Sequence, residues 1–189
     1  MDGMLALRLP KLVEADPRGP HLLQHLTAQA RPLWRRSEME IPVVMLNAGL
    51  AEALKGVHAG GRVMRSLESA EQALATEERG LRMADRRAGA PRGVRVSRLI
   101  LLANDGAERF YRNVETLLSR HGARILAVRL EIDAAGLGEL LFGPGRMARL
   151  VMLTHKKAVG SVLLAMTESP SPEPSIEGAV NKPCVGMMA

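Results

Sequence analysis

Between residues 94 and 166 the sequence alternates short, continuous apolar runs with longer amphipathic segments. The runs VRVSRLILLA, ARILAVRL and RMARLVML have the apolar density of buried strands, and the segments that follow each of them have the spacing of helices. Strands that alternate with helices favour parallel pairing and a sheet that is covered on both faces. The pattern predicts an α/β fold, namely a three-layer α-β-α sandwich of about four strands.

The preceding residues are expected to add two helices and an extension. IPVVMLNAGLAEALKGV is interpreted as one helix with Pro42 near its first turn, and AGGRVM as a turn with a short strand. Residues 66–89 have helical spacing, and Ser66 fits an N-cap. Residues 1–40 are interpreted as an N-terminal extension that contains a short helix, PHLLQHLTAQA, and the only tryptophan, Trp34.

The α/β domain is expected to occupy residues 41–167, with an Arg-rich insertion at 77–97. Residues 168–189 contain Pro, Ser and Glu but no periodic apolar face, so they are expected to form a disordered tail. The single cysteine, Cys184, lies in that tail and excludes an intrachain disulfide. No apolar stretch has membrane-spanning length, and the first residues lack the pattern of a secretory leader. We therefore expect a cytoplasmic protein with no membrane partner.

The charge of the chain bears on its partners. The formal net charge is +6, and arginine supplies most of the positive charge. Arginine binds phosphate with two parallel hydrogen bonds, which suits nucleic acid. A GC-rich genome also favours arginine over lysine, so the charge leaves nucleic-acid binding and simple coding bias equally open.

Asp105 stands where an apolar run stops and an amphipathic segment starts, in LILLANDGAERFY. Ligands of parallel sheets bind beyond the carboxyl ends of strands, so a catalytic or phosphoryl-accepting role is one interpretation. A haloacid-type phosphatase, however, has a second Asp two residues later, where this chain has Ala107. Glu108 follows at the spacing of a capping box, and we expect Asp105 to cap the next helix.

Other catalytic or metal-binding patterns are missing from the sequence. His58, His121 and His155 are scattered without metal-ligand spacing, and no cysteine lies near them. The glycines of HAGGRVM and FGPGR do not form a dinucleotide or Walker pattern, and no serine has a GxSxG context. We expect no catalytic residue, no metal and no cofactor.

Two basic segments remain as candidates for phosphate contact. The first is a group of arginines between residues 79 and 98, which is either a solvated helix end with its loop or a phosphate-contacting arm. The second is THKKAV, where His155 and Lys156 are expected at the ligand edge of the sheet and Thr154 as the helix cap.

Several motifs between residues 43 and 166 resemble those of the kink-turn RNA-binding ribosomal protein superfamily, the L-seven-Ae and L-thirty-e-like proteins. The glycine turn in LKGVHAGGRVM, the strand end LLANDG, and GLGELLFG, with Leu137, Gly138 and Gly143, are similar to elements of that family. The closing ARLVMLTHKKAVGSVLLAM resembles its last strand and helix. The resemblance implies an L-thirty-e-like fold and a structured RNA or ribonucleoprotein as partner.

The family reads RNA with a glycine, an Asn-Glu pair and a lysine on the helix after the turn. These positions hold Ser66, Glu68-Ser69 and Gln72 here, so the resemblance implies a shared fold with an altered RNA-reading set. Phosphate contacts are then expected to dominate RNA binding. The expected RNA-binding residues are Arg62, Arg65, Glu68, Gln72, Arg86, Arg87, Arg92, His155 and Lys156.

Two alternatives to a non-enzymatic RNA-binding or ribosome-associated protein stay open. One is a protein-interaction module that kept the fold without RNA binding. The other is a small Rossmann-like nucleotide-binding enzyme that uses Asp105.

Overall fold

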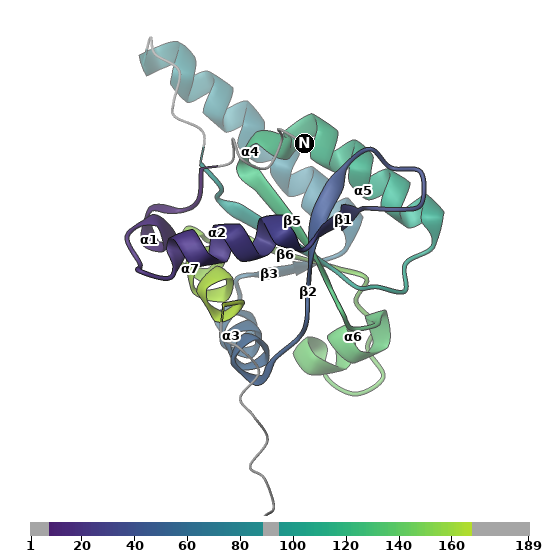
Figure 1. Ribbon diagram of the computed structural model, residues 1–189. Helices are drawn as coiled ribbons and strands as arrows, with labels where there is room; N and C mark the ends of the chain where they lie inside the picture. Colours follow the sequence, from purple (N-terminus) through teal and green to yellow (C-terminus); the bar gives the residue numbers. More distant parts are fainter. Residues whose placement is uncertain (1–7, 89–94, 168–189) are drawn as a thin grey trace, which may run out of the picture.

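The structure is a computed structural model, and it describes residues 8–88 and 95–167 (Figure 1). The predicted tail at 168–189 and Arg92 lie outside the described residues. The helices are α1 (Lys11–Glu14), α2 (Gly19–Ala28), α3 (Ala48–Ala59), α4 (Leu67–Ala88), α5 (Glu108–His121), α6 (Ala134–Phe142), α7 (Lys156–Ala165) and the 3-10 helix η1 (Gly122–Arg124). The strands are β1 (Ala30–Pro32), β2 (Glu40–Val44), β3 (Val63–Arg65), β4 (Arg98–Leu102), β5 (Ile125–Leu130) and β6 (Leu150–Leu153).

The strands form one sheet in the order β1-β2-β5-β4-β6-β3. Strands β2, β5 and β4 are parallel, whereas β1, β6 and β3 each run antiparallel to their neighbours. The α/β class is confirmed, but the described sheet has six strands rather than about four, and it is mixed rather than parallel. The short helix α6 follows β5 and keeps the chain near the carboxyl end of that strand. β6 therefore starts at this end of the sheet and runs in the opposite direction.

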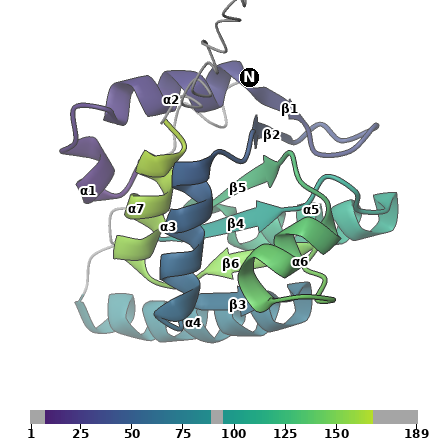
Figure 2. The ribbon, with the colours of Figure 1, turned by 90° about the horizontal axis from the view of Figure 1, so that it is seen from below.

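Helices cover both faces of the sheet, as the apolar runs predict. Along β4, Leu99 and Leu101 join an apolar cluster with α3, α7, α1 and α2, whereas Ile100 and Leu102 face α4 and α5. The same alternation continues in β5 and β6. Figure 2 shows α3 and α7 side by side across one face of the sheet. The three layers of the predicted sandwich are therefore present.

The segment IPVVMLNAGLAEALKGV contains a strand and a helix, so its interpretation as one helix is wrong. Residues 40–44 form β2, with Pro42 inside the strand, and α3 begins only at Ala48. Asn47 caps α3, because its side-chain oxygen accepts a hydrogen bond from the Leu50 amide at 2.6 Å. β-branched residues favour the strand, and an apolar run this short does not distinguish a strand from a helix.

Residues 8–40 pack on both sides of this sheet. Val13, Leu22 and Leu26 are buried in the cluster on the α3 and α7 side, and Leu33 is buried in the cluster on the opposite side. The loop between β1 and β2 is tied to α5, since the Trp34 indole N–H donates to a carboxylate oxygen of Glu115 at 2.7 Å. None of the helices among the described residues has the length and apolar character required to cross a membrane.

Helix α4 begins after a residue with unusual backbone geometry. Ser66 has φ of 137°, a region that favours glycine, and its hydroxyl accepts a hydrogen bond from the Ser69 amide at 3.2 Å. The predicted cap at Ser66 is confirmed. The predicted insertion at 77–97 begins as part of this helix, which continues to Ala88, and Val96 returns beside residue 8 through a backbone hydrogen bond.

Candidate nucleic-acid interface

The edge strand β3 organises the first group of predicted binding residues. β3 pairs with β6, and the backbone amide and hydroxyl of Thr154 both donate to the carbonyl of Arg62, at 3.1 and 3.2 Å. The prediction that Thr154 caps α7 is therefore wrong. The cap is His155, whose Nδ1 accepts a hydrogen bond from the Lys157 amide at 3.3 Å. This arrangement brings Arg62 close to the first residues of α7, where His155 and Lys156 are exposed.

The second group lies at the other end of β3. Arg65, the last residue of the strand, places its guanidinium 5.2 Å from the centre of the Phe142 ring. His58 meets the same ring edge-on, with ring centroids 4.9 Å apart. Phe142 ends α6, and the loop that follows it carries the exposed side chains of Arg146 and Arg149. Arg65 and this loop thus form a basic rim at the carboxyl end of β3.

Sequence reasoning missed the aromatic and loop contributions to this rim. The sequence of FGPGR shows no phosphate-binding pattern, and in the structure this segment turns, with Gly143 and Gly145 at positive φ. The sequence feature that could have indicated this basic rim is Arg146, which directly follows the turn. The contact between Arg65 and Phe142 was not predictable from spacing, because the two residues are far apart in the sequence.

Glu68 and Gln72 lie in the first turns of α4, exposed and one turn apart. They follow Arg65 directly in the chain, so they border the basic rim. Glu68 sits in the first turn of α4, where a carboxylate stabilises the helix dipole. The same carboxylate repels phosphate, so Glu68 is better explained by the helix than by RNA contact.

Arg86 and Arg87 occupy the far end of α4, which projects beyond the rest of the ribbon in Figure 1. With a rise of about 1.5 Å per residue, they lie about 30 Å along the helix from Ser66. The structure therefore does not join them to the Arg65 rim. Both side chains are exposed, so they form a separate basic surface.

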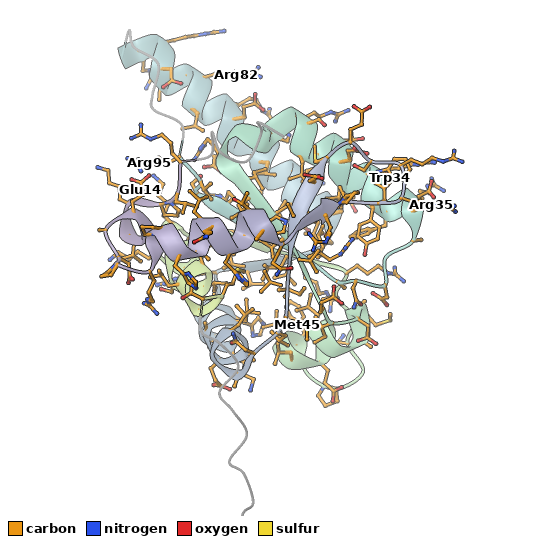
Figure 3. The ribbon with its side chains drawn as sticks, viewed as in Figure 1. Glu14, Trp34, Arg35, Met45, Arg82 and Arg95 are labelled. Atoms are coloured by element: carbon orange, nitrogen blue, oxygen red, sulfur yellow. The ribbon has the colours of Figure 1, made fainter. Side chains whose placement is uncertain are left out.

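The arginines differ in whether they already have a carboxylate partner. In the part of the chain that the structure describes, seven arginines form ion pairs with a described carboxylate: Arg18, Arg82, Arg95, Arg98, Arg112, Arg120 and Arg124. Figure 3 shows one such pair, Arg95 beside Glu14. Within residues 8–88 and 95–167, no carboxylate lies at ion-pair distance from a second set of exposed cations around β3, namely Arg62, Arg65, Arg146, Arg149, Lys156 and Lys157. These six cations are available to an external anion.

Asp105 does not cap the helix that follows it. Helix α5 begins at Glu108, its N-cap is Ala107, and Glu108 pairs with Arg112. The Asp105 carboxylate instead accepts a hydrogen bond at 2.9 Å from the amide of Ala134, the first residue of α6. Because β4 and β5 are neighbouring parallel strands, their carboxyl ends meet at one edge, and Asp105 reaches the helix that follows β5.

Replacement of Asp105 by alanine is expected to lower the free energy of unfolding by about 1 kcal/mol, because the Ala134 amide loses its acceptor. Asp105→Asn keeps a side-chain oxygen in place and should lose less. Urea denaturation of both variants measures the difference. We expect no effect on binding by the cations around β3, and a large loss of nucleic-acid binding or of an activity without a change in stability would give Asp105 a functional role instead.

The chain matches no family model, and no curated protein is similar to it. Among solved structures, one from Bacillus halodurans C, described as a protein with unknown function, is 12% identical, with a TM-score of 0.39, and covers 62% of this chain and 98% of its own. The Giardia lamblia 15.5kD RNA binding protein is also 12% identical, with a TM-score of 0.40 and coverage of 62% and 82%. Both likenesses are weak, and they assign the chain to no family.

Proposed function

We propose that the chain is a non-enzymatic RNA-binding or ribosome-associated protein that holds structured RNA mainly through phosphate contacts. The observation that carries the proposal is the set of exposed cations around β3 that have no carboxylate partner in the described part of the chain. A phosphate backbone supplies regularly spaced negative charges that such a surface can neutralise. The family resemblance of the sequence, which includes the turn before β3 and the GLGELLFG segment, favours RNA as the polyanion.

The cations around β3 form two groups, one at each end of this short strand, so a single RNA segment can reach both. Val63 pairs with Leu153 and Arg65 with Val151, which places Arg62 beside the start of α7 and Arg65 beside the loop before β6. A strand of three residues spans only about 10 Å, comparable to the spacing of neighbouring phosphates along a few nucleotides. Arg86 and Arg87 would add a second, more distant contact with a longer RNA.

The double variant Arg62→Gln, Arg65→Gln tests this proposal. Binding to a structured RNA is measured by filter binding at several salt concentrations. Each lost phosphate contact should reduce the slope of log affinity against log salt by about one. Stability should change little, because both side chains are exposed and solvated.

A matched control removes the same charge from another surface. Arg35 and Arg36 are exposed in the loop between β1 and β2, at the opposite edge of the sheet, and Figure 3 shows Arg35 at the periphery. Arg35→Gln, Arg36→Gln should leave the slope nearly unchanged. Equal effects of the two double variants would mean that net charge alone attracts RNA, and the β3 surface would not be the site.

The altered residues on α4 also predict weak sequence preference. A kink-turn RNA and an unrelated duplex should compete almost equally, since phosphate contacts carry no sequence information. Strong kink-turn selectivity that survives the double variant would contradict this part of the proposal. Absence of RNA binding at low salt would favour the protein-interaction alternative.

A further inference from the structure

A pocket of about 340 Å³ opens between α4 and the end of α5, on the side of the sheet that these two helices cover. This volume is in the range of pockets that hold small ligands. Apolar side chains of Leu74, Leu81 and Ile125 line part of it. The rest of the lining comes from α4, β4, the last turn of α5 and η1, and it includes Glu77, Glu78, Arg98, Arg120, His121, Gly122 and Arg124.

Two arginines in this pocket converge on one atom. Nη2 of Arg98 and Nη2 of Arg124 each lie 2.9 Å from the same oxygen, Oε1 of Glu77. Arg124 also donates to the hydroxyl of Ser97, a buried residue, at 2.8 Å, which fixes its guanidinium. Burial lowers the pKa of Arg98, and the positive charge of Arg124 acts in the same direction. Among the described residues, one carboxylate therefore serves two partly buried cations, and one positive charge is left without a partner of its own.

The other charged residues of the pocket do not remove this excess. Arg120 pairs with Glu71 at 3.0 Å, and His121 Nδ1 lies 3.0 Å from a carboxylate oxygen of Glu78. The hydrogen bond from Arg82 holds the pKa of Glu78 below its usual range, so that carboxylate stays ionised for its partners. Glu77 is thus the carboxylate on which both Arg98 and Arg124 depend.

We propose that this pocket binds a small phosphate monoester with an apolar body. A phosphate group presents three oxygens and up to two negative charges, so it satisfies two converging guanidinium groups better than one carboxylate oxygen does. The apolar lining would hold the organic part of the ligand. In the ligand-free protein Glu77 occupies the anion position and competes for both arginines. The proposal does not depend on RNA binding, because the cations around β3 take no part in this pocket.

The experiment uses the full chain with phenyl phosphate as probe and isothermal titration calorimetry as readout. Glu77→Gln should bind phenyl phosphate more tightly than the unmodified chain, because the competing charge is removed. Arg124→Gln should bind about tenfold more weakly, as expected for the loss of a charge-assisted hydrogen bond. Arg18→Gln removes an equal charge from an exposed pair with Asp16 and should leave binding unchanged.

A further variant blocks the pocket without altering its charges. A Cβ atom at Gly122 would meet no atom within 4 Å, and the backbone of this residue has helical φ and ψ that any residue adopts. Gly122→Leu should therefore fold normally and lose phenyl phosphate binding. Circular dichroism verifies the fold of each variant. If Arg124→Gln does not fold, Gly122→Leu alone serves as the loss-of-binding test.

Specific outcomes overturn the proposal. It is wrong if neither the unmodified chain nor Glu77→Gln binds phenyl phosphate at millimolar concentration. It is also wrong if Gly122→Leu binds as well as the unmodified chain, since the phosphate then binds elsewhere. A 5′-phosphorylated dinucleotide that binds more tightly than its 5′-hydroxyl form, and loses this advantage in Gly122→Leu, would support the pocket and identify an RNA end as the source of the monoester.

Discussion

Gly138→Ala is expected to lower the free energy of unfolding by about 3 kcal/mol, the upper part of the range for an overpacked site. Gly138 lies in α6 against the chain that returns to β6. A Cβ atom there would lie 2.2 Å from the carbonyl oxygen of Arg146 and 2.6 Å from the Cα atom of Met147. Both are backbone atoms, so no change of rotamer relieves the contact. The helix or the 143–149 loop must move.

Thermal denaturation measures this effect, and the melting temperature should fall by about 10 °C. The matched control is Gly56→Ala in α3, where a Cβ atom would have no neighbour within 4 Å. That variant should gain up to about 1 kcal/mol, because alanine favours the helix more than glycine does. If Gly138→Ala were as stable as the control, the loop would not pack on α6 as described. Because this loop carries Arg146, Gly138→Ala should also weaken the RNA binding that we propose.

Leu22→Ala is expected to cost about 3 kcal/mol, as for other fully buried leucines. Leu22 lies on α2, within the residues interpreted as an N-terminal extension, and its exposed fraction is 0%. Its side chain belongs to the apolar cluster that also contains α3, α7 and one face of the sheet. The truncation leaves a cavity in this cluster, and the surrounding side chains fill it only partly.

Urea denaturation gives the change in unfolding free energy, with Leu12→Ala as the matched control. Leu12 lies on α1 and is 50% exposed, so its truncation should cost less than about 1 kcal/mol. A single cooperative transition that shifts as a whole is expected for Leu22→Ala, because α2 shares the core of the domain. A small effect, equal to that of Leu12→Ala, would show that residues 8–40 fold independently of the sheet.

Local patterns in the sequence determined most of the elements. Apolar runs predicted β4, β5 and β6, and helical spacing predicted α4, α5, α6 and α7. Ser66 was recognisable as a cap, since this signal depends on residues within three positions. The three-layer arrangement also followed from the alternation, because each strand must bury two apolar faces. These features depend on interactions between near neighbours, which a sequence displays directly.

Only the tertiary structure decided which partner each element and side chain has. β2 becomes a strand because β1 and β5 flank it, whereas its short apolar run fits a helix equally well in isolation. Asp105 has the local spacing of a cap for α5, yet its carboxylate bonds to α6, because parallel pairing places the ends of β4 and β5 together.

The candidate sites likewise depend partly on local sequence and partly on tertiary structure. The sequence identified the basic residues, and the structure separated those with carboxylate partners from those without. It also divided the predicted RNA-binding residues between the two ends of β3 and the far end of α4. Glu77, Arg98 and Arg124 come from three separate segments, and no spacing relates them. Contacts between distant segments depend on the path of the whole chain, so a pattern of neighbours could not reveal this pocket.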